Sequence, residues 1–234
     1  MIKRLTSFLI VTIFLFCITC CKVNISEEKN PFMPVIVPEM VKVSGGIIEG
    51  KDYPWAPPKG NFPKGRRVQL SDFVIGKYEV TQEEYYSVMK DEVVSVTAYV
   101  DGVGERTAEF FMDSRPSFCK PNNPPYHCFE GENQERRPVE GITFYDALWY
   151  CNVLSRKTGL EPVYKIKVLE VTSVNFSSHI TSAEVEMIPG ANGYRLPTAC
   201  EAEYAMRGGD PNAPDWDYLF CCADSEPGRE RYSI

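Results

Sequence analysis

The stretch NGYRLPTACEAEYAMRGG, residues 192–209, decides the fold because a turn, a helix start and a helix end all lie within it. The Asn-Gly pair at its start is typical of a turn, and Pro197 moves the residue before it away from helical backbone angles. A helix can therefore begin only after Pro197. Thr198 is then the N-cap residue, and Glu201 stands three residues later, where its carboxylate can bond the Thr198 amide in a capping box.

The same stretch predicts how this helix packs and ends. Arg207 supplies a cation for the negative end of the helix dipole, and Gly208 and Gly209 allow the backbone to leave the helix. Arg195 precedes the turn proline, from where it can bond a buried carboxylate and fix the turn; we favour this structural role over substrate binding. Near-helical spacing predicts one apolar face, made of Ala199, Ala202, Ala205 and Met206.

Two earlier segments carry the same helix-start pattern. Thr81 is followed three residues later by Glu84, and Thr143 by Asp146, so each pair predicts a capping box. After Thr143, apolar residues recur at three- and four-residue spacing as far as Gly159, which indicates an amphipathic helix. The apolar face of this helix is predicted to be Phe144, Ala147, Leu148, Cys151 and Leu154. The sequence therefore predicts three helices.

Short strands and long loops are predicted between the helices. The strand patterns cover residues 40–43 and 47–50 around a glycine turn, 68–80 with a possible break at Gly76, and 165–176 with 180–188 as a hairpin. Residues 51–65 hold four prolines and two glycines and predict a loop. Residues 91–137 show no sustained periodicity and predict a long variable surface insertion. These features together indicate an α+β fold with little regular secondary structure.

The N-terminal residues have the pattern of a secretory leader. Lys3 and Arg4 precede an apolar run from Leu5 to Ile18, which is short for a membrane span. Cys20 and Cys21 follow, then a polar run, and this order resembles a bacterial lipoprotein signal. We expect residues 1–20 to be the signal peptide, Cys21 rather than Cys20 to be lipidated, and the chain to be exported and anchored to the bacterial cell envelope. An ordinary signal peptide or an uncleaved anchor are the alternatives.

Composition and length bound the rest of the chain. Residues 21–38 are polar and then proline-rich, which predicts a flexible tether. With 234 residues in total and 44% hydrophobic residues, one folded domain is expected over residues 39–220, followed by an irregular tail over 221–234. The net charge is −7, and loss of Lys3 and Arg4 with the leader makes it −9. An acidic surface argues against nucleic acid as the partner.

Cysteines give a weaker signal. An exported chain can form disulfides, but spacing alone does not choose among the possible connectivities. Cys119 with Cys128 would close a short proline-rich loop and is the favoured pair, against free thiols. The cysteines beyond the leader are Cys119, Cys128, Cys151, Cys200, Cys221 and Cys222.

The run from Arg195 to Gly209 resembles the R-L-P-T-E-A-E-W-E-Y-A-x-R-G-G segment of the formylglycine-generating enzyme (sulfatase-modifying factor) family. Ala199 stands where the family has Glu, and Ala202 where it has Trp. Three more segments resemble family motifs in the same order: residues 75–85, residues 138–152 including Asp146 and Asn152, and residues 160–164. The chain is thereby identified as a member of that family.

The resemblance implies a fold related to C-type lectin-like domains and an enzyme that oxidises a sulfatase cysteine to formylglycine. In the family, copper on two cysteines, the calcium ligands and a G-N-V-W-E-W segment all follow the R-L-P-T helix. The residues beyond Gly209 contain none of these motifs, so we expect an incomplete domain with no catalytic residue, metal ligand or cofactor. Cys221 and Cys222 are adjacent, and neighbouring side chains cannot easily oppose two thiolates on copper(I).

Other polar residues are interpreted structurally. His127 and His179 are expected on the surface, His179 in a turn, with no carboxylate at ligand spacing. Glu201 and Glu203 are expected to serve as cap and solvated face rather than as an acid/base pair.

Two functional hypotheses follow. The first is a family surface lipoprotein that is inactive as an oxidase; whether the chain is an enzyme stays open, because it can also be a fragment of an active copper-dependent oxidase. The second is a non-catalytic module that binds a protein or glycan through residues 91–137, where aromatic side chains collect. These are Tyr99, Phe110, Phe111, Phe118, Tyr126 and Phe129.

Overall fold

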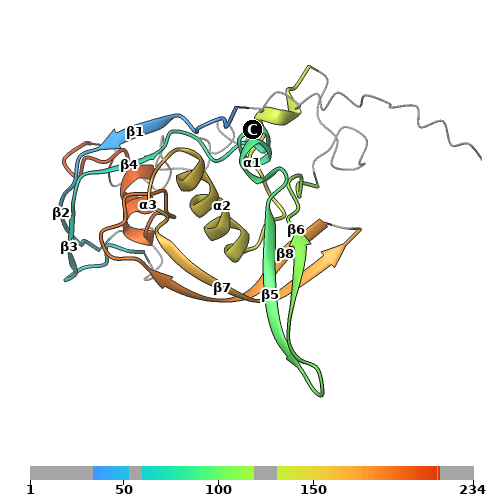
Figure 1. Cartoon of the computed structure of the whole chain (residues 1–234). Coiled ribbons are helices and arrows are strands. Elements are labelled where there is room, and N and C mark those ends of the chain that lie inside the picture. Colours follow the sequence, from blue (N-terminus) through green and yellow to red (C-terminus); the bar gives the residue numbers. More distant parts are fainter. Residues whose placement is uncertain (1–33, 53–59, 119–130, 176, 215, 217–234) are drawn as a thin grey trace, which may run out of the picture. The chain divides into compact units, whose positions relative to one another are not determined.

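The structure, a computed structural model, describes residues 34–52, 60–118, 131–175, 177–214 and 216 (Figure 1). Within these residues the helices are α1 (Gln82–Met89), α2 (Phe144–Lys157), α3 (Ala199–Met206) and the 3-10 turn η1 (Gln134–Arg136). The strands are β1 (Met40–Val43), β2 (Gly46–Glu49), β3 (Arg67–Leu70), β4 (Phe73–Gly76), β5 (Val93–Val100), β6 (Gly104–Phe111), β7 (Tyr164–Val174) and β8 (Ser177–Met187). The predicted α+β class with three α-helices is confirmed.

The first four strands form two antiparallel pairs, β1 with β4 and β2 with β3. The strands predicted over 40–43 and 47–50 around a glycine turn therefore do not pair with each other. Gly45 serves another purpose, because a Cβ there would lie 2.2 Å from the Leu70 carbonyl oxygen. The single strand predicted over 68–80 is also wrong: it divides at Ser71 and Asp72, where the Asp72 carboxylate accepts a hydrogen bond from the Gly45 amide. The predicted break at Gly76 is the end of β4.

The prediction that residues 91–137 lack regular structure is wrong. Strands β5 and β6 pair in register from Val93 opposite Phe111 to Val100 opposite Gly104. The signal was present in the sequence, because β-branched and aromatic residues, mostly valine, dominate β5, and Gly102 and Gly104 adopt the positive φ angles that a tight turn requires. Residues 119–130, with the Cys119–Cys128 pair, Tyr126, His127 and Phe129, lie outside the described residues.

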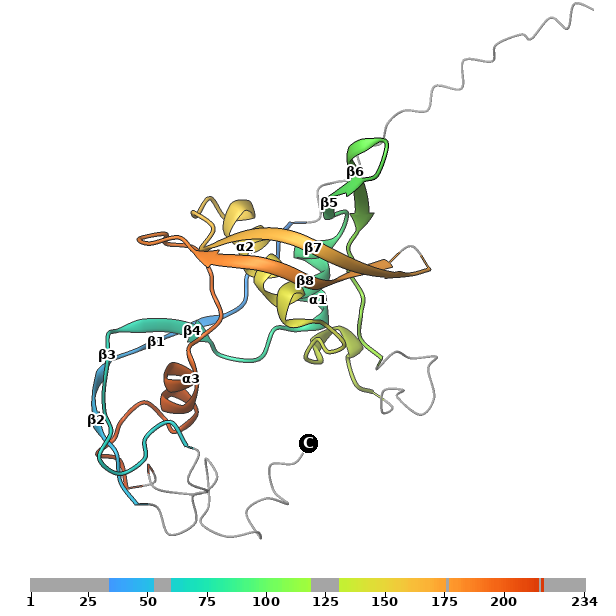
Figure 2. The same ribbon diagram turned by 90° about the horizontal axis from the view of Figure 1, so that it is seen from below.

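The larger core forms around α2. This helix packs on α1 and on the β7–β8 hairpin (Figures 1 and 2). The predicted apolar face is confirmed for Leu148, Cys151 and Leu154, which are buried, whereas Phe144 is 64% exposed. Burial of the α2 face rather than helix propensity alone therefore holds this helix in place.

Asn152, in the middle of α2, joins the helix to the first residue of β7. Its side-chain amide donates to the Tyr164 carbonyl (2.6 Å) and its carbonyl accepts from the Tyr164 amide (3.1 Å). A side-chain amide thus takes the place of a neighbouring strand for both backbone groups of Tyr164. The Tyr164 hydroxyl then accepts a hydrogen bond from the Leu196 amide (3.0 Å), which ties β7 to the turn before α3.

A smaller core holds α3. Tyr204 packs edge-on against Trp216, with ring centroids 5.5 Å apart, and Phe62 and Ile48 are buried beside them. The predicted apolar face of α3 is wrong: Met206 is 69% exposed, and the buried face carries Tyr204 and Glu201. Alanines at near-helical spacing do not by themselves indicate the buried face of a helix, because a methyl group buries little apolar area.

The predicted leader, both candidate lipidation cysteines and the tail over 221–234 lie outside the described residues. Within the described ranges, no helix is both long and apolar enough to cross a bilayer.

Replacing Asn152 by alanine should lower the free energy of unfolding by about 2–4 kcal/mol, because the amide and carbonyl of Tyr164 would both be left without a partner in a buried position. Urea denaturation of the full chain measures this value. Asn212→Ala is the matched control: Asn212 is exposed, and its side chain donates to Asp210 at the surface, so its loss should change stability by less than about 0.5 kcal/mol. Equal losses in the two variants would contradict the account.

Candidate functional site

Arg195 and Glu201 form a two-pronged ion pair that fixes the turn before α3. The guanidinium donates from Nη2 to Oε1 (2.7 Å) and from Nη1 to Oε2 (2.8 Å). The same carboxylate accepts from the Thr198 amide (2.8 Å), and Thr198 Oγ1 accepts from the Glu201 amide (3.2 Å). Hydrogen bonding from Arg195 lowers the pKa of Glu201 to about 2. The capping box and the structural role of Arg195 are both confirmed.

Glu203 is not a solvated residue as predicted. Its side chain is only 16% exposed. Its Oε2 accepts from the amide and the side chain of Asn61 (2.8 Å each), and its Oε1 accepts from Nε of Arg207 (3.1 Å). Arg207 also donates to the Trp216 carbonyl (2.9 Å). These contacts hold α3 to the loop at Asn61 and to the small core, so the predicted structural role of Arg207 extends beyond the helix end, where Gly208 and Gly209 take positive φ angles as expected.

Asp146 is the most deeply buried carboxylate among the described residues. It is fully buried and lies in the first turn of α2. Its Oδ2 accepts from the Thr143 amide (3.0 Å), which completes the predicted capping box. Its Oδ1 accepts from the Ile180 amide of β8 (2.8 Å), and Thr143 Oγ1 donates to the Ile180 carbonyl (2.7 Å). The start of α2 and the start of β8 therefore form one joint. The capping box predicted at Thr81 and Glu84 is also present, and its hydrogen bonds lie at the start of α1.

The prediction that His179 lies in a surface turn without a carboxylate nearby is wrong. It lies in β8, 27% exposed, with Nδ1 2.7 Å from Asp146 Oδ2 and Nε2 3.7 Å from Asp113 Oδ2. The hydrogen bond to Asp146 raises the pKa of His179 above its ordinary value. Sequence spacing could not find these partners, because they lie on other elements 33 and 66 positions away.

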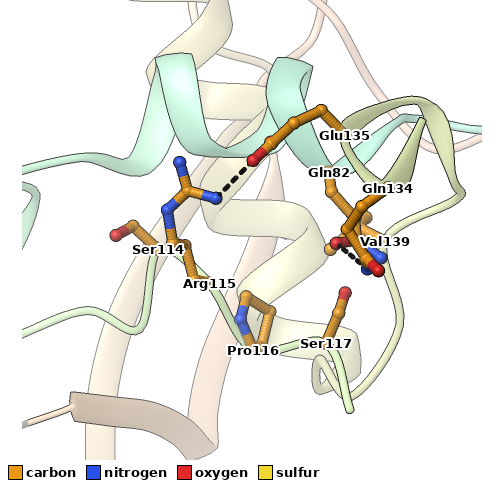
Figure 3. Close-up of a pocket in the computed structure, with 8 residues that line it drawn as sticks. All are labelled: Gln82, Ser114, Arg115, Pro116, Ser117, Gln134, Glu135 and Val139. Atoms are coloured by element: carbon orange, nitrogen blue, oxygen red, sulfur yellow. Dashed lines mark hydrogen bonds and ion pairs between the residues drawn. The ribbon is translucent and has the colours of Figure 1, made fainter. Parts of the chain in front are cut away.

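A pocket opens beside the same segment of chain. It measures about 230 Å³ and is lined by Gln82, Ser114, Arg115, Pro116, Ser117, Gln134, Glu135 and Val139 (Figure 3). These residues come from the first turn of α1, the segment after β6, η1 and the run before α2. Six of the eight fall inside residues 91–137, the region that the sequence suggested for recognition.

The charged residues of the pocket balance each other. Arg115 Nη1 donates to Glu135 Oε1 (2.9 Å), and the guanidinium lies 3.8 Å from the ring centre of Tyr86. Gln134 Nε2 donates to Gln82 Oε1 (2.9 Å), as the dashed lines in Figure 3 show. Pro116 and Val139 add apolar surface. The arrangement suits hydrogen bonding and van der Waals contact with a ligand rather than attraction of a net charge.

The cysteines are the candidate groups for redox or metal chemistry. Cys151 is buried, and burial raises the pKa of its thiol to about 12, which disfavours the thiolate form. Cys200 is partly exposed, with its sulfur 3.7 Å from Nη2 of Arg66. Among the residues the structure describes, no three His, Cys, Asp or Glu side chains are placed to share a metal ion.

A family model described as "Sulfatase-modifying factor enzyme 1-like domain" matches residues 27–226. A protein named "Chaperone protein LppX" from Paenibacillus barcinonensis is 38% identical over 146 residues, which make up 62% of this chain and 39% of that protein. The chain also resembles the solved structures titled "Crystal Structure of CarF" and "Treponema denticola variable protein 1". For the first, identity is 22% and the TM-score 0.48, over 81% of this chain and 64% of that one. For the second, the values are 22% and 0.46, over 84% and 64%. The chain thus spans less than two thirds of the length of each of these proteins.

Replacing Glu201 by glutamine should lower the free energy of unfolding by about 1–2 kcal/mol near pH 7. The pKa of Glu201 is lowered from 4.5 to about 2 on folding, so the stabilisation is complete above pH 4.5 and is lost as the pH falls toward 2. The difference between wild type and variant, measured by urea denaturation, should therefore shrink in acid. Glu186→Gln, which removes an exposed pair with Lys165, should have little effect at any pH. A Glu201→Gln loss that does not change between pH 7 and pH 3 would be inconsistent with this assignment.

Proposed function

The chain belongs to the family of the sulfatase-modifying factor enzyme 1-like domain, and on that premise we propose that it is a binding module, exported and lipid-anchored, which uses the family scaffold to hold a ligand rather than to oxidise a cysteine. The observation that carries the proposal is the pocket formed by α1, residues 114–117, η1 and Val139. Its residues are held from several elements of the fold, so the site exists before a ligand arrives.

The lining of the pocket favours a neutral, hydroxyl-rich ligand such as a sugar of a glycan. Gln82 and Gln134 offer amide donors and acceptors, and Ser114 adds a hydroxyl beside the apolar surfaces of Pro116 and Val139. Arg115 and Glu135 neutralise each other, so a strongly charged ligand would lack a counter-charge. A sugar ring presents both hydroxyl groups and an apolar face, which fits this mixture.

The cysteine chemistry supports a role other than oxidation. Copper(I) is bound by thiolates, and burial of Cys151 in the core disfavours its thiolate form. We therefore propose that ligand binding by this chain needs no copper, calcium or other cofactor.

The proposed location rests on the leader. A basic start, an apolar run and Cys20 with Cys21 favour attachment to the membrane of the cell envelope through a lipid, which would place the domain on a tether. The net charge of −7 opposes nucleic acid as a ligand.

A protein ligand is the second candidate. It is favoured by the relative named "Chaperone protein" and by exposed aromatic side chains on the β5–β6 hairpin, where Tyr99 is 73% and Phe111 62% exposed.

A copper-dependent oxidase remains the alternative that family membership favours. Incubating the full chain with copper and a cysteine-containing sulfatase peptide distinguishes an oxidase from a binding module. The binding proposal predicts that no aldehyde forms, and formation of the aldehyde would overturn it.

A glycan array probed with the full chain tests the proposed pocket. The wild type should bind a restricted set of sugars, and Gln82→Ala should weaken that binding about fivefold to tenfold, because one or two hydrogen bonds to the ligand are lost. Gln69→Ala, an exposed glutamine on β3, is the matched control and should bind as the wild type does. No sugar binding at all, or equal binding by Gln82→Ala, would refute the assignment of the ligand to this pocket.

A further inference from the structure

The proton positions on His179 follow from the groups around it. Asp146 accepts hydrogen bonds from two backbone amides, those of Thr143 and Ile180, so its carboxylate acts as an acceptor. The His179 nitrogen 2.7 Å away, Nδ1, must therefore be the donor in their hydrogen bond. This leaves Nε2 as the ring nitrogen whose protonation changes with pH.

Nε2 faces a second carboxylate. Asp113 Oδ2 lies 3.7 Å from it, and the two side chains are 27% and 22% exposed. When His179 is neutral, Nε2 presents a lone pair to a negatively charged oxygen, and that arrangement is repulsive. When His179 is protonated, the same arrangement is an ion pair in partly desolvated surroundings. The position of Asp113 therefore favours a proton on Nε2.

The Asp113 carboxylate also controls the start of the pocket wall. Its other oxygen, Oδ1, accepts a hydrogen bond from the Arg115 amide (2.9 Å), and the Asp113 amide donates to the Ser178 carbonyl of β8 (2.9 Å). One carboxylate thus connects His179 to the backbone of Arg115, whose side chain lines the pocket. A rotation of this carboxylate away from Nε2 would take Oδ1 away from the Arg115 amide as well.

We propose that protonated His179 is a latch that holds the Asp113–Ser117 wall of the pocket in place through the Asp113 carboxylate, and that deprotonation loosens this wall; the consequence for ligand binding rests on the function proposed for the pocket. Among the described residues, two carboxylates face His179, those of Asp146 on α2 and Asp113 after β6, and the Tyr85 hydroxyl on α1 interacts electrostatically with both of them. Tyr85 is buried, and its pKa is raised by burial and then by the charges of Asp146 and Asp113, so it stays neutral.

The direction of the pH effect follows from the shift in the pKa of His179. The hydrogen bond with Asp146, and then the charges of Asp146 and Asp113, raise the pKa of His179 above 6.5, against the opposing effect of burial. The latch is therefore closed below pH 6.5 and opens as the pH rises through the pKa of the folded protein.

An NMR titration of the full chain carrying His127→Gln tests this latch without any ligand, so its result is independent of the glycan array. His179 should titrate above pH 6.5, and the Arg115 amide resonance should shift with the same midpoint. Asp113→Asn keeps an acceptor for the Arg115 amide but removes the charge, so the pKa of His179 should fall and the shift of the Arg115 resonance should be lost. His179→Gln, which cannot be protonated, should likewise abolish that shift.

Two results would overturn the latch. One is a His179 pKa at or below 6.5 in the chain with Asp113 intact. The other is an Arg115 amide resonance that stays still while His179 titrates, or that keeps its shift in His179→Gln. If Asp113→Asn does not fold, the His179→Gln titration alone decides between these outcomes.

Discussion

The rest of the structure depends on one buried carboxylate, that of Asp146. A carboxylate with no exposure to solvent is tolerated only when hydrogen-bond donors surround it, since an unpaired one costs several kcal/mol. The donors are the Thr143 amide, the Ile180 amide and the His179 ring. The first turn of α2 and the start of β8 must therefore meet at this point. Because Ser178 of β8 in turn binds the Asp113 amide, the same joint determines where the pocket wall begins.

The three α-helices begin with the same capping motif, but the acidic residue of that motif makes only local contacts in one helix and tertiary contacts in the other two. Each of the three α-helices begins with a threonine and an acidic residue in a capping box. At α1 the Glu84 carboxylate accepts from the amide of its own cap residue, Thr81, and from no other group among the described residues. At α2 and α3 the acidic residue also binds a group outside the helix, namely Ile180 with His179, or Arg195. A local motif worth about 1 kcal/mol thereby becomes a tertiary contact that orients the helix.

This division explains how much could be predicted from the sequence. Helix starts, the β7–β8 hairpin and the role of Arg195 depend on residues close together in the chain, and these predictions are confirmed. The His179 site, the Asn61 contacts of Glu203 and the pocket unite residues from separate elements, so no local spacing reveals them. The β5–β6 hairpin was missed for another reason: most of its residues are exposed on both faces, so apolar and polar residues do not alternate, and only the strand propensity of β5 indicated a strand.

The joint at Asp146 thus links the fold of this family member to its proposed function, because it positions His179, whose Nε2 lies 3.7 Å from the Asp113 carboxylate at the start of the pocket wall. A double-mutant cycle of Asp146→Asn and His179→Gln, measured by urea denaturation at about pH 6 and pH 9, tests this joint most directly. The account predicts a coupling free energy of about 1–3 kcal/mol at pH 6 that becomes smaller at pH 9. Additive losses at both pH values would contradict it.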